Sequence, residues 1–219
     1  AYPNALNLPI DESKIPPFVK PYIELTQKMA FLLAQISKSE IRSINVSAEG
    51  ELADYLDSLQ TFATLGILAV SCGSEVNYVN ANFIAKEKGI DLSVSALANH
   101  SGYKNKVTIK ITTVNGIKTI SGTVFADDVQ RVIELDGFAI DVDPKGKMIV
   151  MKNKDIPGVI GTVGKLLGDN KINIADFRLS RGKDGIALAI ALIDEKVTSE
   201  IIKNLDNLEA TIAVAYAEI

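Results

Sequence analysis

The stretch from Met148 to Arg181 constrains the fold of this chain more than any other. Its first four residues are apolar, and a polar loop then leads to Pro157 and Gly158, which is typical of a strand that runs into a helix. Apolar residues follow at helical spacing and then resume at strand spacing from Ile172. The stretch therefore predicts a strand, a helix and a strand, with polar side chains gathered at one end.

The residues after this stretch complete a recognisable order of elements. A turn at 182–185 leads into residues 186–193, which are almost wholly apolar and typical of a strand buried on both faces. Thr198 or Ser199 is expected to cap a second helix, and residues 211–219 to form a last strand. The order from residue 147 is strand, helix, strand, strand, helix, strand, which is the split pattern of a ferredoxin-like sandwich.

The first part of the chain predicts a different arrangement. Apolar residues recur every three or four positions over 17–37, which indicates an amphipathic helix. Ile41 begins a predicted strand, and residues 52–70 are expected to form a buried helix. A short helix is expected to end at Gly89, before a strand that starts at Ile90.

Strands dominate the middle of the chain. Residues 107–112 alternate apolar and polar side chains, and Asn115-Gly116 favours a type I′ hairpin after them. Asp136-Gly137 predicts a second two-residue turn. We therefore expect an α+β chain, with an antiparallel sheet backed by helices over 17–143 and a ferredoxin-like βαββαβ domain over 147–219. Residues 1–16 are expected to be a lead-in from an upstream part, since the chain begins with Ala1.

Composition excludes several classes of protein. A net charge of −4 with 6% aromatic residues and no Trp argues against a nucleic-acid surface. The single cysteine, Cys72, excludes an internal disulfide and Cys-based zinc or iron–sulfur sites, and it is expected to fill a small space in the core. The longest apolar run, 62–70, is far shorter than the ~20 residues of a membrane span. We expect a cytosolic chain with no nucleic-acid or membrane partner.

Two sets of residues carry a family resemblance. Asp155-x-Pro157-Gly158-Val159-Ile160-Gly161, followed by Ile172-Asn173-Ile174-Ala175, resembles an ACT domain, the amino-acid-sensing module of metabolic enzymes. The upstream residues are similar to the allosteric substrate-binding domain of long-form D-3-phosphoglycerate dehydrogenases. That similarity runs through 76–81, 86–89, 121–125 and 135–137. The resemblance implies the C-terminal regulatory portion of such an NAD-dependent dehydrogenase. The lead-in from Asn4 to Leu8 also resembles the point where that family's chain leaves its catalytic part.

The chain itself lacks the family's catalytic features. It contains no GxGxxG nucleotide loop, because Gly158, Gly161 and Gly164 are spaced three apart within a predicted helix. His100, the only histidine, lies in a predicted polar loop and is expected to be solvated. We expect no catalytic residue, metal site or cofactor in this fragment, with NAD bound by the upstream catalytic part.

The loop before the predicted helix has the chemistry of an effector site. Free N–H groups at a helix start attract a carboxylate, and Asp155 can accept a hydrogen bond from an α-ammonium. By resemblance the ligand is L-serine, held between the ACT domains of two subunits with Asn173 reaching in from the neighbour. The predicted effector residues are Asn153, Asp155, Ile156, Pro157, Gly158 and Asn173. Alternatively, Asp155 only caps the helix and Asn173 only begins a strand.

The resemblance also implies an anion site for a phosphorylated acid, such as 3-phosphoglycerate, in the upstream domain. Its candidate cations are Arg131, Lys145, Lys147, Lys86 and Lys88. A phosphate site needs several convergent cations, and solvated surface lysines are the alternative interpretation.

The sequence thus predicts an allosteric module that forms homo-oligomers through its ACT domains and senses L-serine as a feedback effector. Two alternatives stay open. One is a purely structural oligomerisation module, and the other is the regulatory portion of an iron–sulfur L-serine dehydratase.

Overall fold

The computed structural model describes residues 15–98 and 101–219. His100 and nearly all of the predicted lead-in lie outside these residues. The helices are α1 Lys20–Ser37, α2 Leu56–Cys72, α3 Ala81–Glu87, α4 Val159–Asp169 and α5 Ser199–Asp206. The strands are β1 Ile41–Glu49, β2 Asp91–Leu97, β3 Lys106–Thr113, β4 Gly116–Val124, β5 Gln130–Leu135, β6 Phe138–Val142, β7 Lys147–Lys154, β8 Ile174–Arg181, β9 Ile186–Ile193 and β10 Thr211–Glu218.

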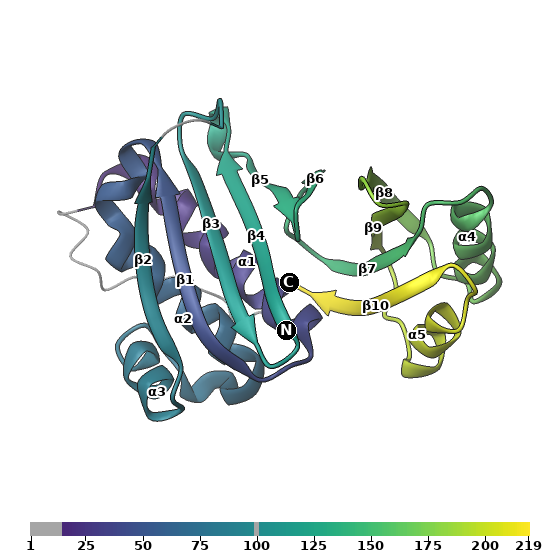
Figure 1. Cartoon of the computed structure of the whole chain (residues 1–219), viewed down its shortest axis with the longest axis horizontal. Helices are drawn as coiled ribbons and strands as arrows, with labels where there is room; N and C mark the ends of the chain where they lie inside the picture. The colour runs from purple at the N-terminus through teal and green to yellow at the C-terminus, as the bar shows by residue number, and fades with distance from the viewer. Residues whose placement is uncertain (1–14, 99–100) are drawn as a thin grey trace.

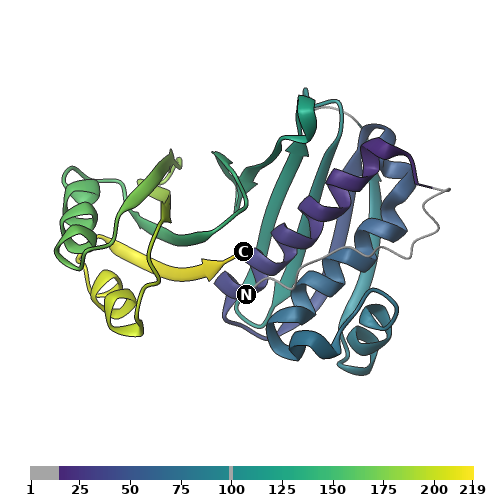
Figure 2. The ribbon, with the colours of Figure 1, turned by 180° about the vertical axis from the view of Figure 1, so that it is seen from behind.

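The first six strands form one sheet in the order β2-β1-β3-β4-β5-β6. Helices α1, α2 and α3 cover one face of it, as the two opposite views show (Figures 1 and 2). The predicted sheet backed by helices is confirmed, with one exception to its antiparallel pairing. β1 and β2 run parallel, because the chain between them crosses over through α2 and α3, the long connection that a parallel pair needs.

Helix α1 is the centre of the larger core. Its apolar side chains recur at helical spacing, and Ile23, Leu25 and Met29 are fully buried. Two glycines let α2 and β4 pack closely against α1. A side chain on Gly66 of α2 would meet the Gln27 carbonyl oxygen, and one on Gly122 of β4 would meet Met29.

Helix α2 is apolar along most of its length. One segment of the described chain, Gly50–Glu75, passes a length-and-hydropathy test for a membrane span, with a mean hydropathy of 1.2. It contains α2, whose side chains pack in the core against α1, so core packing accounts for this composition. Cys72 at its end is half-buried and packs against the same core, as predicted.

The hairpin between β3 and β4 is confirmed, but its predicted turn type is wrong. Thr113 pairs with Gly116, so the two loop residues are Val114 and Asn115 rather than Asn115 and Gly116. A type I′ turn needs positive φ at both loop residues, and here only Gly116, after the loop, has it, at φ 122°. The Asp136-Gly137 turn does have positive φ at both residues, at 49° and 82°.

The last four strands form a second sheet in the order β10-β7-β9-β8, the ferredoxin-like order that the sequence predicts. Helices α4 and α5 cover its outer face, and its inner face joins the core of the first sheet (Figure 1). β9 is buried on both faces, as expected. Thr198 caps α5 by accepting a hydrogen bond from the Ile201 N–H.

Polar contacts tie the two sheets together beside their shared core. The Gln35 side chain of α1 exchanges hydrogen bonds of 3.1 and 3.2 Å with the Glu218 backbone of β10. The Asp136 carboxylate, at the turn between β5 and β6, pairs with Lys118 of β4 at 3.3 Å and with Lys152 of β7 at 2.7 Å. Asp136 thus links the first sheet to the second through its charge.

Asp136 should make the stability of the chain depend on pH. Burial alone would raise the pKa of its carboxyl, but hydrogen bonds from Lys152 and the Thr119 N–H, with the charges of both lysines, hold that pKa below its ordinary value. The stabilising effect of this carboxylate is therefore complete above its unfolded-state pKa of ~4 and is lost as the pH falls through the lower folded-state pKa.

Asp136→Asn keeps an acceptor for the Thr119 N–H and removes the charge. We expect the free energy of unfolding to fall by about 1.5 to 3 kcal/mol at neutral pH, the range for hydrogen bonds to charged groups. Urea titrations of both chains at neutral and acid pH measure this difference. It should shrink towards zero in acid, and a difference independent of pH would contradict the assignment.

Candidate functional site

A hollow of about 370 Å³ opens where β7 ends and α4 begins. Five of the six predicted effector residues line it, namely Asn153, Asp155, Ile156, Pro157 and Gly158. Val159, Ile160 and Gly161 of α4 and Leu179 and Arg181 of β8 complete the lining. The sequence thus located one wall of a pocket whose opposite wall comes from β8.

The start of α4 leaves backbone donors at this pocket. Gly158 is the N-cap residue of α4, with φ 91°, and no side chain caps the helix. The first N–H groups of a helix have no partner within the helix and carry partial positive charge. Asp155 therefore does not cap α4 in this structure, contrary to the alternative interpretation. The uncapped end can receive an anionic group.

Asn153 carries the least expected feature of the pocket. Its side chain is only 2% exposed, and its Nδ2 donates to the Lys154 carbonyl oxygen at 2.7 Å. Its Oδ1 atom is buried and has no hydrogen-bond partner among the described residues. Leaving a buried acceptor unpaired costs about 1 to 3 kcal/mol. Such an atom at the wall of a pocket is suited to a ligand that donates a hydrogen bond.

Opposite charges meet across the same pocket. Arg181 Nε donates to Asp155 Oδ2 at 2.6 Å, and the Arg181 side chain is 73% exposed. One Nε–H of a guanidinium is used in this contact, so its terminal N–H groups are left to bind a carboxylate. The pocket therefore offers an anion, a cation and a neutral acceptor within one small volume.

Arg181 and Leu179 line the pocket but were not among the predicted site residues. The signal was available in the predicted strand order, because a ferredoxin-like sheet places β9 between β7 and β8. Ala187 of β9 pairs with Asn153 on one side and with Arg181 on the other. Counting back from the turn of the β8–β9 hairpin would have placed Arg181 opposite Ala187, on the far side of β9 from Asn153.

Asn173, the sixth predicted effector residue, lies at the other end of β8. Its Nδ2 donates to Asp194 Oδ2 at 2.6 Å, and its N–H donates to Glu195 Oε2 at 2.7 Å. The β8 residues that line the pocket, Leu179 and Arg181, lie six and eight residues further along the strand, roughly 20 to 25 Å away. Asn173 therefore cannot reach the pocket of its own chain.

β8 is an edge strand. It pairs with β9, and no other described strand pairs with it. Leu179 is 40% exposed on this strand. A long edge with unpaired N–H and C=O groups is a template for adding another strand.

The predicted anion-site cations are spread over the molecule. Arg131 and Lys145 both approach Asp143, at 3.7 and 2.6 Å, and Arg131 also pairs with Asp141. Lys147 donates to the Asp194 carbonyl oxygen. Lys86 lies on α3 and Lys88 just after it, and α3 packs near β2 at the opposite edge of the sheet from β5 and β6. An anion site built by this set stays a prediction.

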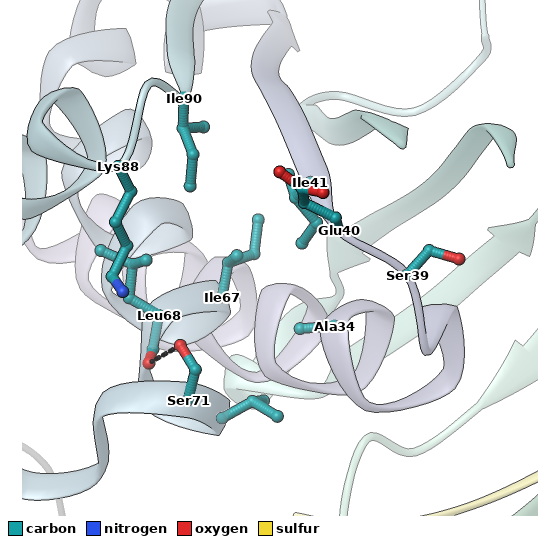
Figure 3. A pocket seen from close by; sticks show the side chains of 10 residues that line it. Ala34, Ser39, Glu40, Ile41, Ile67, Leu68, Ser71, Lys88 and Ile90 are labelled. Atoms are coloured by element: carbon teal, nitrogen blue, oxygen red, sulfur yellow. Dashed lines mark hydrogen bonds between the residues drawn. The ribbon is translucent and has the colours of Figure 1, made fainter. Parts of the chain in front are cut away.

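Lys88 borders a different cavity, between the ends of α1 and α2 and the start of β1 (Figure 3). Its walls are largely apolar, with Ile41, Ile67 and Ile90 among them. Lys88 is the one cation of this lining, and Glu40 on the opposite wall is an anion. This cavity lacks the convergent cations that a phosphate needs.

Comparison with known proteins gives two matches along the chain. A family described as the D-3-phosphoglycerate dehydrogenase intervening domain matches residues 18–136, and the ACT domain matches residues 147–210.

The curated relatives of this chain include proteins named D-3-phosphoglycerate dehydrogenase. The protein from Bacillus subtilis is 34% identical over 218 residues, which cover 99% of this chain and 42% of the relative. The protein from Archaeoglobus fulgidus is 31% identical over 220 residues, with the same two coverages. The protein from Synechocystis is 30% identical over 207 residues, which cover 91% of this chain and 37% of the relative. The chain thus spans about two fifths of the length of these relatives.

Proposed function

Since this chain belongs to the D-3-phosphoglycerate dehydrogenase family, with its intervening domain followed by an ACT domain, we propose that it regulates such an enzyme by binding L-serine. The ligand occupies the pocket at the start of α4. The catalytic reaction, its NAD and a cytosolic location belong to the whole protein under this proposal. The names of the relatives favour the dehydrogenase over an iron–sulfur dehydratase.

The observation that carries the proposal is the unpaired Oδ1 of buried Asn153, in a pocket that also holds Asp155 and Arg181. An α-amino acid carries an ammonium and a carboxylate on one carbon, and the pocket offers partners for both. The ammonium is assigned to Asp155 and Asn153 Oδ1, which accept hydrogen bonds. The carboxylate is assigned to Arg181 and the first N–H groups of α4.

A second copy of the chain completes the pocket in this proposal. Pairing of two β8 edges across a two-fold axis would run the strands antiparallel, so the start of one β8 lies opposite the end of the other. The partner subunit's Asn173 would then lie beside Arg181. Its Oδ1 is left to accept from the ligand, because Nδ2 donates to Asp194. The separation of Asn173 from the pocket within one chain supports this arrangement.

Regulation follows from the shared pocket. A ligand held by two subunits stabilises the paired arrangement of ACT domains relative to any other. L-serine can shift the attached enzyme only by the difference between its affinities for the two arrangements. Feedback inhibition requires that the arrangement favoured by L-serine be the less active one.

Titration calorimetry of the 219-residue chain with L-serine tests this proposal. We expect saturable binding of L-serine and at least tenfold weaker binding of D-serine, because the pocket has to match three groups around one chiral carbon. Asn153→Ala should weaken binding by roughly 5- to 150-fold, which corresponds to about 1 to 3 kcal/mol.

Asn170→Ala is the matched control, because Asn170 is an exposed residue at the far end of α4. It should leave the affinity for L-serine unchanged. A chain that forms dimers but shows no heat with millimolar L-serine would instead be a structural oligomerisation module.

A further inference from the structure

The cavity between the ends of α1 and α2, which Lys88 borders, has a volume of about 420 Å³. The side chains of Ile67 and Ile90 point toward one another across it (Figure 3), and Ile41 lines the same interior. Val70, also in the lining, is 46% exposed, so the hollow opens to water. Sites for small molecules are hollows of about 300 to 1,000 Å³ that are mostly apolar and carry a few polar groups. This cavity matches that description.

Two opposite charges border the apolar walls. Glu40 precedes β1, Lys88 is the C-cap residue of α3, and both residues are exposed. Within the part of the chain that the structure describes, neither side chain forms an ion pair. The formal charge of the lining is therefore zero, and a ligand with complementary charges carries one of each sign.

The ends of two helices add partial negative charge to this cavity. Ala34 and Ser71 of its lining belong to the last turns of α1 and α2. The last C=O groups of a helix have no partner within the helix and carry partial negative charge. Neither helix has a basic residue in its last turn, and Lys38, the C-cap residue of α1, donates to the Val214 carbonyl oxygen of β10 instead. A positively charged group is therefore favoured beside Glu40.

We propose that this cavity binds an α-amino acid with an aliphatic side chain, the class of L-leucine. The ammonium pairs with Glu40 and the carboxylate with Lys88. Both side chains are long and exposed, so both can turn toward one α-carbon. The aliphatic part lies among the three isoleucines of the lining, where burial of apolar area favours binding. The inference goes beyond the proposed function, because no residue of the α4 pocket lines this cavity.

Titration calorimetry of the 219-residue chain with L-leucine tests the proposal. We expect saturable binding with one site per chain. Arg181→Met should bind L-leucine as tightly as the natural chain, because Arg181 lines only the α4 pocket. Loss of L-leucine binding in Arg181→Met would place the ligand in the α4 pocket and overturn the proposal. These titrations contain no L-serine, so their failure leaves the proposed function unaffected.

Two analogues separate the charged groups of the ligand. Isoamylamine is leucine without its carboxylate, and isocaproate is leucine without its ammonium. Glu40→Gln should weaken the binding of L-leucine and of isoamylamine by roughly 10- to 150-fold, the effect of losing a hydrogen bond to a charged group. Lys88→Met should weaken the binding of L-leucine and leave that of isoamylamine unchanged. Isocaproate should bind more weakly than isoamylamine, because the helix ends favour the positive group, and the reverse order would contradict the assignment.

Glu87→Gln and Lys86→Met are the matched controls. Both residues are exposed on α3, and neither lines the cavity. Both variants should keep the natural affinity for L-leucine, whereas Val70→Phe, which adds volume to the lining without changing a charge, should weaken it. Equal losses in the controls and in the cavity variants would reduce the effect to general charge and overturn the proposal. A natural chain that melts as a folded protein but binds no L-leucine would overturn it as well.

Discussion

Replacing Arg181 by methionine is expected to remove L-serine binding from this chain almost completely. The guanidinium is the one cation in the lining of the α4 pocket, and under the proposal it receives the carboxylate of the ligand. Losing one partner of a charged pair that becomes buried in a complex costs about 2 to 4 kcal/mol, or roughly 30- to 1,000-fold in affinity. Titration calorimetry of Arg181→Met with L-serine measures this loss.

The size of this loss separates the proposal from its alternative. In the unliganded chain the Arg181 side chain is 73% exposed, and an exposed ion pair contributes about 0 to 1 kcal/mol to stability. The melting temperature without L-serine should therefore change little. If Arg181 were only a surface residue paired with Asp155, the affinity for L-serine would be equally insensitive.

Arg178→Met is the matched control for Arg181→Met. Both arginines lie on β8, and each donates from Nε to a carboxylate, Asp176 in the case of Arg178. Their side chains point to opposite faces of the sheet because they are three residues apart on a strand. Arg178→Met should retain L-serine binding, and a comparable loss in both variants would contradict the assigned role of Arg181.

Periodic patterns predicted most of the fold, because packing alone determines those elements. The spacing of apolar residues in α1 follows from its contact with α2 and the sheet, and the all-apolar run of β9 follows from burial on both faces. The ferredoxin-like order then follows from the sequence of elements.

Features that depend on contacts between distant residues were not predictable from local patterns. The β3–β4 turn takes Val114 and Asn115 because the register of the strands overrides the preference of Asn115-Gly116. The sequence motif at the start of α4 indicated Asp155. Arg181 lies outside that motif, and only the pairing register of β8 with β9 places it at the pocket. The contacts of Asp136 with Lys118 and Lys152 depend on the docking of the two sheets, which no local pattern encodes.

Loss of either half of the α4 pocket should weaken L-serine binding strongly in a symmetric dimer. Asp155→Ala removes the acceptor for the ammonium from a chain's own half, and Asn173→Ala removes the group that each chain supplies to its partner. Under the proposal each variant alone binds L-serine at least tenfold more weakly. Both should still dimerise, because neither side chain is needed for the pairing of backbone edges at β8.

Mixing these two variants tests the shared pocket most directly. Each mixed dimer has one pocket with both substitutions and one pocket with neither. Random exchange of equal amounts therefore restores natural-affinity binding at roughly one site for every four chains. Calorimetric titration of the mixture with L-serine should show this recovery, whereas the separate variants show none. A mixture that binds no better than its two components would contradict a pocket built from two chains.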